Sequence, residues 1–169
     1  MIHHSALIIH HSLVVLGIDP GTTVTGYGVV AQEGQRLSLV TAGQIRGGSS
    51  LGLAERLSRI HAGLAKIIRD YGPQEVAVEE VFYAKNVRSA VMLGHGRGVA
   101  LLAAAEAGLT VYEYPATIIK KAVVGYGQAS KHQVRTMVER LLGAAPGLGL
   151  DTSDALAVAI CHLHHGGRS

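Results

Sequence analysis

Two short apolar runs in this chain each end in a carboxylate. Residues 13–18 are followed by Asp19, and residues 76–78 are followed by Glu79. An ionised carboxylate at the end of a buried strand is costly, because in an apolar medium its pKa must rise or a cation must lie beside it. The two runs therefore predict buried strands whose ends share a bound cation.

Two further acids, Asp151 and Asp154, open a segment with helical spacing. Residues three apart lie on one side of a helix, so both side chains can reach the same region over its first turn. Acids at this position also cap helices and suit the helix dipole, which is the alternative to a metal site. The same side continues through Val158 and Cys161, so Asp154 is expected to turn toward the sheet. We predict that all four acids share bound divalent metal.

The order of the apolar patterns predicts a mixed sheet. Strands are expected at residues 13–18, 25–31, 37–45, 75–80 and 109–114, and helices at residues 51–71, 86–107, 116–124, 131–142 and 151–164. Short connections between the first three strands predict an antiparallel meander. The later strand-helix-strand crossings predict two parallel strands. The expected fold class is α/β, with a mixed five-stranded sheet and helices on both faces.

Composition indicates a globular chain of one domain. Of its 169 residues 48% are hydrophobic and 16% charged, which excludes the disordered and fibrous classes. The single Cys161 excludes a disulfide framework and fits a reducing compartment. The longest apolar stretch, residues 90–107, is interrupted by charged residues and glycines, so it predicts a buried helix and no membrane span. A cytoplasmic protein is expected.

The two ends of the chain are expected to lie outside the domain. Residues 1–12 lack the basic start and the cleavage site of a signal peptide, so they are expected to form a disordered extension. The single domain is expected over residues 13–165, followed by a tail at residues 166–169. Histidines are crowded at both ends, but neither group has the cysteines or the spacing of a structural zinc site, so zinc is not expected.

Basic residues are concentrated in one part of the sequence. Residues 81–140 carry eight Lys and Arg against three Glu, and the four acids described above all lie outside this range. A basic half beside an acidic pocket suits a phosphate polymer that is delivered to metal ions. Solvated helix faces would give the same charge pattern, and charge alone leaves that alternative open.

The turn that follows the first strand permits a second interpretation. Residues 19–23, Asp-Pro-Gly-Thr-Thr, resemble the phosphate-binding hairpin of the actin and sugar-kinase ATPases. Those folds need a second such hairpin, an adenosine-binding segment and two lobes, none of which the sequence offers. An ATPase is therefore the less favoured interpretation.

Four segments together resemble the RuvC family of bacterial Holliday junction resolvases: residues 16–30, 78–86, 121–125 and 151–159, in the family's order. The resemblance runs from about Leu13 to His164. It implies a ribonuclease H-like fold in which the first and fourth strands are neighbours. It also implies a structure-selective endonuclease that resolves four-way DNA junctions by paired, symmetric cuts leaving 5′-phosphate nicks, in recombination and repair.

The resemblance assigns roles residue by residue. It implies that the four acids bind two Mg²⁺ or Mn²⁺ ions and that Lys131 takes part in catalysis, and hard oxygen donors favour the same ions. Strand pleating turns Glu79 and Glu80 to opposite faces, so Glu79 is the expected ligand. The implied DNA-binding residues are Phe82, Lys85, Asn86, Arg88, Arg97, Lys120 and Lys131, with Phe82 stacking at the junction centre.

Partners are also implied by the resemblance: a homodimer, and the branch-migration proteins RuvA and RuvB. Helix 86–107 contains Gly94, Gly96 and Gly98, each of which weakens a helix unless close packing compensates. Apolar Val91, Met92, Val99 and Leu102 lie beside them, so the helix suits close packing either on its own sheet or on a second copy. The resemblance to a dimeric family favours a two-fold interface on this helix. Two other functions remain open: another ribonuclease H-like nuclease acting on RNA or an RNA-DNA hybrid, and a non-catalytic junction-binding module.

Overall fold

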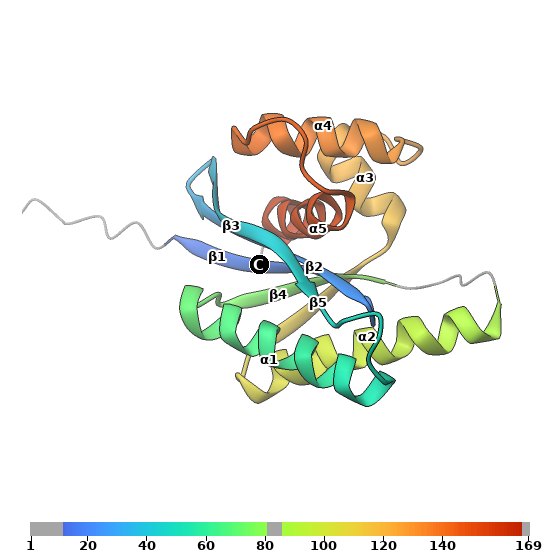
Figure 1. Cartoon of the computed structure of the whole chain (residues 1–169). Helices are drawn as coiled ribbons and strands as arrows, with labels where there is room; N and C mark the ends of the chain where they lie inside the picture. The colour runs from blue at the N-terminus through green and yellow to red at the C-terminus, as the bar shows by residue number, and fades with distance from the viewer. Residues whose placement is uncertain (1–11, 81–85, 167–169) are drawn as a thin grey trace, which may run out of the picture.

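The computed structural model describes residues 12–80 and 86–166. Five strands form one sheet in the order β3-β2-β1-β4-β5 (Figure 1). The strands are β1 (Leu13–Asp19), β2 (Val24–Glu33), β3 (Arg36–Arg46), β4 (Glu75–Glu79) and β5 (Thr110–Tyr114). The helices are α1 (Leu53–Tyr71), α2 (Val87–Glu106), α3 (Ala116–Val124), α4 (Lys131–Leu142) and α5 (Leu150–Gly166).

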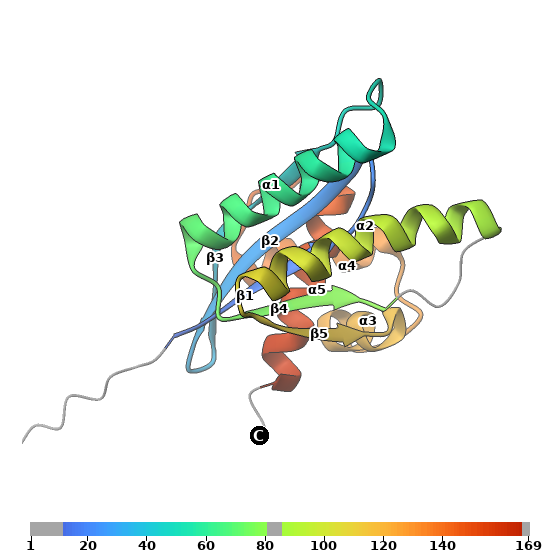
Figure 2. The same ribbon diagram turned by 90° about the horizontal axis from the view of Figure 1, so that it is seen from below.

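The sheet is mixed, as predicted. Strands β1, β2 and β3 pair antiparallel, whereas β4 pairs parallel with both β1 and β5. Helices α1 and α2 cover one face, and α3, α4 and α5 cover the other (Figures 1 and 2). The predicted α/β fold class is therefore confirmed, and each predicted element is present with bounds that differ by at most two residues at either end.

Alternation along the central strands gives each helical layer its own core. Val15 and Ala77 pack with α3, α4 and α5, whereas their neighbours Leu16 and Val76 pack with α1 and α2. All four side chains are fully buried. Because a strand sends successive side chains to opposite faces, the face on which each strand-end acid lies is already set by these core residues.

Glycines on β1 and β2 let α5 approach the sheet closely. A Cβ at Gly17 would lie 1.9 Å from a carbonyl oxygen of α5, and a Cβ at Gly26 would lie 2.1 Å from another. At Gly28 the added atom would lie 2.4 Å from the side chain of Leu156. At Gly17 and Gly26 no larger residue fits unless α5 moves, and at Gly28 the Leu156 side chain would have to shift. The glycines thus hold the first turns of α5 directly against the end of β1.

None of the helices in the described part of the chain is long and apolar enough to cross a membrane. Most of the apolar stretch at residues 90–107 lies in α2, which buries one side and exposes the other. Ala100, Ala103 and Ala104 are buried, while Leu102 is half exposed. Cys161 is buried within α5.

Candidate metal centre

The two strand-end acids share one face of the sheet. Asp19 ends β1 and Glu79 ends β4, and the register of these parallel neighbours pairs Ile18 with Val78, the residues just before them. Alternation from Gly17 and Ala77, which face α5, places both carboxylates on the α5 side. Sheet topology therefore brings together two acids that are 60 residues apart in the sequence.

Helix α5 brings the other two acids to the same place. Asp151 and Asp154 lie in its first turns, which rest on the glycines of β1 and β2. Burial and, after it, the charges of Asp154, Asp151 and Glu79 together raise the pKa of Asp19 to about 7. A carboxyl that is perturbed by three others lies in a shared anionic site. The four predicted acids are therefore brought together.

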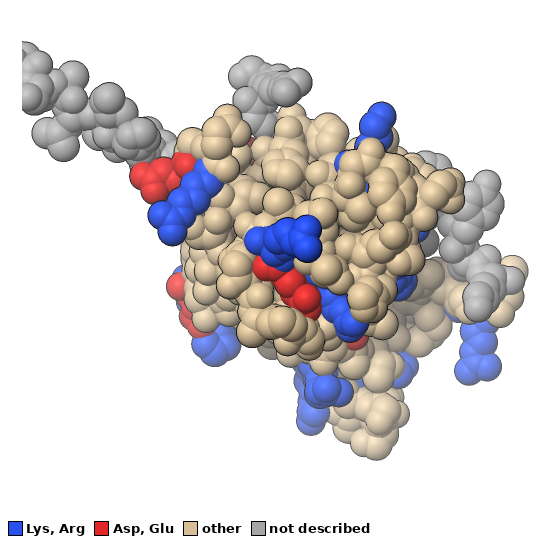
Figure 3. All heavy atoms as spheres, turned by 90° about the horizontal axis from the view of Figure 1, so that it is seen from above, with Lys and Arg blue, Asp and Glu red and all other residues tan. Residues whose placement is uncertain are grey.

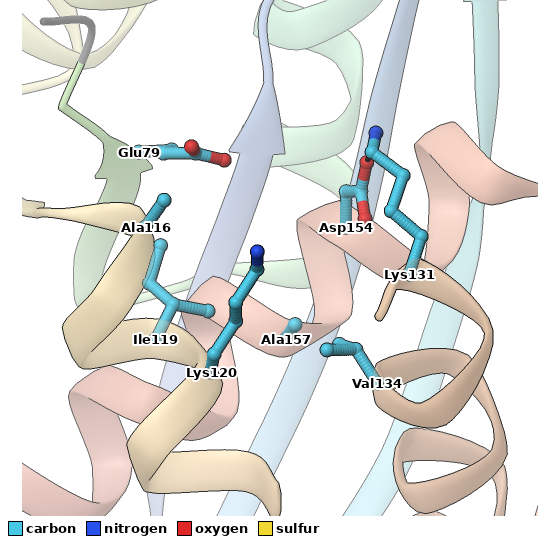
Figure 4. Close-up of a pocket in the computed structure, with 8 residues that line it drawn as sticks. All are labelled: Glu79, Ala116, Ile119, Lys120, Lys131, Val134, Asp154 and Ala157. Atoms are coloured by element: carbon cyan, nitrogen blue, oxygen red, sulfur yellow. Dashed lines mark hydrogen bonds and ion pairs between the residues drawn. The ribbon is translucent and has the colours of Figure 1, made fainter. Parts of the chain in front are cut away.

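Two lysines supply positive charge beside the acids. Lys131 Nζ donates a hydrogen bond to Asp154 Oδ2 at 2.8 Å, and this contact raises the pKa of Lys131. Burial and the charge of Asp154 raise the pKa of Glu79, and the charges of Lys131 and Lys120 oppose that rise. Figure 4 shows both lysine side chains directed toward the acids, from α3 and α4.

These side chains line a small cavity. Its volume is about 60 Å³, and it is lined by Glu79, Ala116, Ile119, Lys120, Lys131, Val134, Asp154 and Ala157 (Figure 4). A water needs about 10 to 15 Å³ of such space, so the cavity can hold an ion together with water. Apolar residues form its floor, while the acids and lysines form its rim.

The chemistry of the donor set suits a hard divalent cation. All four acids offer carboxylate oxygen, which Mg²⁺ and Mn²⁺ prefer, whereas zinc favours His and Cys. In the described residues no three His, Cys, Asp or Glu side chains already converge on one ion position. Asp151 instead accepts a hydrogen bond from Gln44, and Asp154 accepts one from Lys131. The residues fit the ion, and its binding would compete with the hydrogen bond between Lys131 and Asp154.

Apart from Arg97, the predicted DNA-binding residues fall into three groups. Lys120 and Lys131 border the acids. Asn86 and Arg88 are exposed at the start of α2, where the Asn86 side chain accepts a hydrogen bond from the Ser89 backbone and caps the helix. Phe82 and Lys85 lie outside the described residues. The start of α2 extends beyond the sheet (Figure 2), so Asn86 and Arg88 do not belong to the acidic cluster itself.

Arg97 is placed differently from the other basic residues. Its side chain is only 19% exposed and forms an ion pair with Glu113 on β5. It also donates a hydrogen bond from Nη1 to the Glu79 carbonyl oxygen at 3.1 Å. Arg97 therefore stabilises the end of β4 from the α2 side of the sheet, a role that was not predicted from the sequence. Contact between Arg97 and DNA stays a prediction.

Comparison with known proteins gives one family. A family model described as crossover junction endodeoxyribonuclease RuvC matches residues 15–162. A relative with that name from Syntrophotalea carbinolica is 53% identical over 150 residues, which cover 89% of this chain and 93% of the relative. Another, from a Geobacter species, is 50% identical over 157 residues, which cover 93% of this chain and 96% of the relative.

A solved structure has the same fold. It is Thermus thermophilus RuvC in complex with a Holliday junction substrate, and it is similar to this chain with a TM-score of 0.86 at 36% sequence identity. The match covers 91% of this chain and 94% of the Thermus chain. The similarity therefore includes the whole sheet and the helices on both of its faces.

Proposed function

The chain belongs to the RuvC family of crossover junction endodeoxyribonucleases, and we propose that it resolves four-way DNA junctions by metal-dependent hydrolysis of two opposed phosphodiesters. One observation carries the proposal. Asp19, Glu79, Asp151 and Asp154 come from three separate elements, and the charges of the other three acids all help to raise the pKa of Asp19. A relative with the same fold binds a Holliday junction.

Two Mg²⁺ or Mn²⁺ ions held by these four acids are the proposed cofactors. When bound, such ions would activate a water and stabilise the leaving 3′ oxygen in an in-line displacement, giving a 5′-phosphate and a ligatable nick. Raised pKa values at Asp19 and Glu79 support the assignment, because burial and the charges of neighbouring acids raise them by more than the nearby lysines lower them.

Lys131 is proposed to stabilise charge on the phosphate that reacts. Its side chain is 67% exposed, while its Asp154 partner is 19% exposed, so the ammonium lies at the mouth of the site. Ser130 caps α4 and fixes its first residue, Lys131, in place. An ion bound by Asp154 would weaken the hydrogen bond to Lys131, and the ammonium could then donate to a phosphate oxygen.

DNA is proposed to cross the basic surface around the acids. Lys and Arg side chains are spread over the face that α3 and α4 cover, with few acidic side chains among them (Figure 3). Lys120 and Lys131 would contact the backbone next to the cut, and Asn86, Arg88 and Arg97 remain proposed contacts on the side of α2. Lys85 is a further proposed contact. Phe82 is proposed to stack on an unpaired base at the junction centre.

A homodimer built on α2 is proposed to deliver two active sites to opposed strands. Val87, Val91 and Leu102 recur at helical spacing on this helix and are 81%, 51% and 51% exposed. Gly94 and Gly98 are exposed on the same helix, with nothing within 4 Å of an added Cβ, so a second backbone can approach there. A two-fold interface places the same patch of both copies in contact. RuvA and RuvB are proposed as further partners on the family resemblance alone.

The test compares three substrates in the presence of Mg²⁺ or Mn²⁺. A mobile four-way junction, a linear duplex of the same sequence and an RNA-DNA hybrid are incubated with the protein, and the cuts are mapped. The proposal expects paired cuts at symmetric positions in the junction, with 5′-phosphate ends that ligase seals. Preferred cutting of the hybrid would assign the chain to an RNA-directed nuclease, and binding without cutting would assign it to a non-catalytic module.

A further inference from the structure

One row of residues crosses the sheet beneath the first turn of α5. Asp19 on β1 pairs with Gly26 on β2, and Gly26 pairs with Gln44 on β3. Residues paired in this way point to the same face of a sheet. Asp151 lies directly over Gly26, since a Cβ there would come within 3.0 Å of the Asp151 Cβ. Asp151 thus lies between an acid on one side and an amide on the other.

Backbone contacts fix the position of the Asp151 main chain. Its carbonyl oxygen lies against Gly26, and the next residue, Thr152, donates a hydrogen bond from Oγ1 to the Gly43 carbonyl oxygen at 3.3 Å. These contacts tie the first turn of α5 to both β2 and β3. The remaining freedom is rotation of the Asp151 side chain, which decides whether its carboxylate faces Asp19 and the ion site.

Gln44 restricts that rotation. Its Nε2 donates a hydrogen bond to Asp151 Oδ2 at 3.0 Å, while its Oε1 accepts one from Arg46 Nη2 at 3.1 Å. Because a guanidinium only donates, the amide oxygen must face Arg46, and the amide NH₂ must then face Asp151. One carboxylate oxygen is engaged by the amide, and the second oxygen stays available to a cation.

We propose that Gln44 is a positioning residue that orients Asp151 for metal binding, and that Arg46 fixes the orientation of the Gln44 amide. This inference rests on the metal-dependent function proposed above. It extends the site from the four acids to an edge strand that carries none of them. Groups that orient metal ligands in this way contribute to metal affinity without touching the ion.

The test measures Mn²⁺ binding by the DNA-free protein, with calorimetry or electron paramagnetic resonance. Gln44→Met keeps the length of the side chain and removes the donor, and it is expected to weaken Mn²⁺ binding about tenfold. Arg46→Gln removes only the group that fixes the amide, and it is expected to weaken binding about threefold. Gln32→Met, the same change near the far end of the neighbouring strand β2, is the matched control and should bind like the unaltered chain.

Two further readouts separate positioning from a structural role. Junction cleavage by Gln44→Met should need more Mn²⁺ for its half-maximal rate and approach the unaltered rate at saturation. The melting temperature without metal should equal that of Gln32→Met. Equal Mn²⁺ affinity of the two glutamine variants, or a lower melting temperature for Gln44→Met alone, would overturn the inference. Absence of Mn²⁺ binding by the unaltered chain would overturn the metal site itself.

Discussion

The ammonium of Lys131 lies 2.8 Å from Oδ2 of Asp154 and joins the first residue of α4 to the second turn of α5. In the metal-free molecule this contact offsets part of the negative charge of four acids. Lys131 also lowers the pKa of Asp19 and of Glu79 by its charge. The same ammonium can therefore donate to Asp154 in the metal-free site and to a phosphate oxygen once an ion and DNA are bound.

Lys131→Met is expected to slow junction cleavage on the order of a hundredfold, since it removes a charge that stabilises the reacting phosphate. Loss of its charge also raises the pKa of Asp19 and Glu79, so the pH of half-maximal cleavage should move upward. Rates measured from pH 6 to pH 9 on one junction test both effects. Lys121→Met, on the exposed side of α3, is the control and should leave the pH profile in place.

Asp19 makes the metal-free protein sensitive to pH. Its pKa is about 7 in the folded chain against an ordinary value of 3.8, so between these values the folded state binds more protons than the unfolded state. Stability from this group is present at low pH and is lost as pH rises through about 7. The melting temperature of Asp19→Asn, relative to the unaltered chain in EDTA, should therefore rise between pH 5 and pH 8. A constant difference would mean that Asp19 ionises normally.

Gly17 tests how closely α5 must approach the sheet. A Cβ at this position would lie 1.9 Å from a backbone oxygen of α5, so Gly17→Ala should destabilise the fold by about 1 to 3 kcal/mol. It should also weaken Mn²⁺ binding, because the displaced helix carries two of the acids. Gly94→Ala, made in the Leu102→Glu variant so that the proposed interface plays no part, is the contrast: within one subunit it meets nothing within 4 Å and should stabilise the helix by up to about 1 kcal/mol. Urea denaturation of both variants measures these changes in the free energy of unfolding.

Leu102 tests the proposed dimer. It is 51% exposed on α2, so Leu102→Glu should give a folded monomer that nicks junctions singly. Val99 is unsuitable for this test although it was predicted to share the interface, because it packs against the core between α1, α2 and the sheet. Leu141→Glu, at an exposed leucine of α4, should stay dimeric by light scattering. A dimeric Leu102→Glu would place the interface elsewhere.

The sequence predicted the sheet and the acids because both depend on local patterns. The alternation of apolar residues and the carboxylates that end two strands can both be recognised within a few residues. The family resemblance supplied the order of the strands. Gln44 was missed because its place depends on a register shift between Val29 and Val30 of β2 and their partners on β3. A regular ladder continued from the pair Val30 and Leu39 would put Gly43 opposite Gly26 and turn Gln44 to the other face.

Arg97 was predicted only as a DNA contact for a similar reason. Its partners Glu113 and Glu79 lie on two different strands, and no local pattern indicates that a basic residue of α2 reaches them. Sequence also could not distinguish Leu102 from Val99, three residues apart on one helix, because the exposed stripe of α2 depends on how the helix rests against α1. Long-range packing decided each of these cases.

The most direct measurement separates junction binding from junction cleavage in Asp154→Asn. The substitution keeps the size of the side chain and removes one metal-ligating carboxylate, and α5 remains fixed by the glycines of the sheet. We expect the variant to bind a four-way junction with the affinity of the unaltered protein and to lose at least a hundredfold in cleavage rate in Mg²⁺. Equal loss of binding and cleavage, or cleavage that persists, would contradict the assignment of the four acids to one metal-dependent active site.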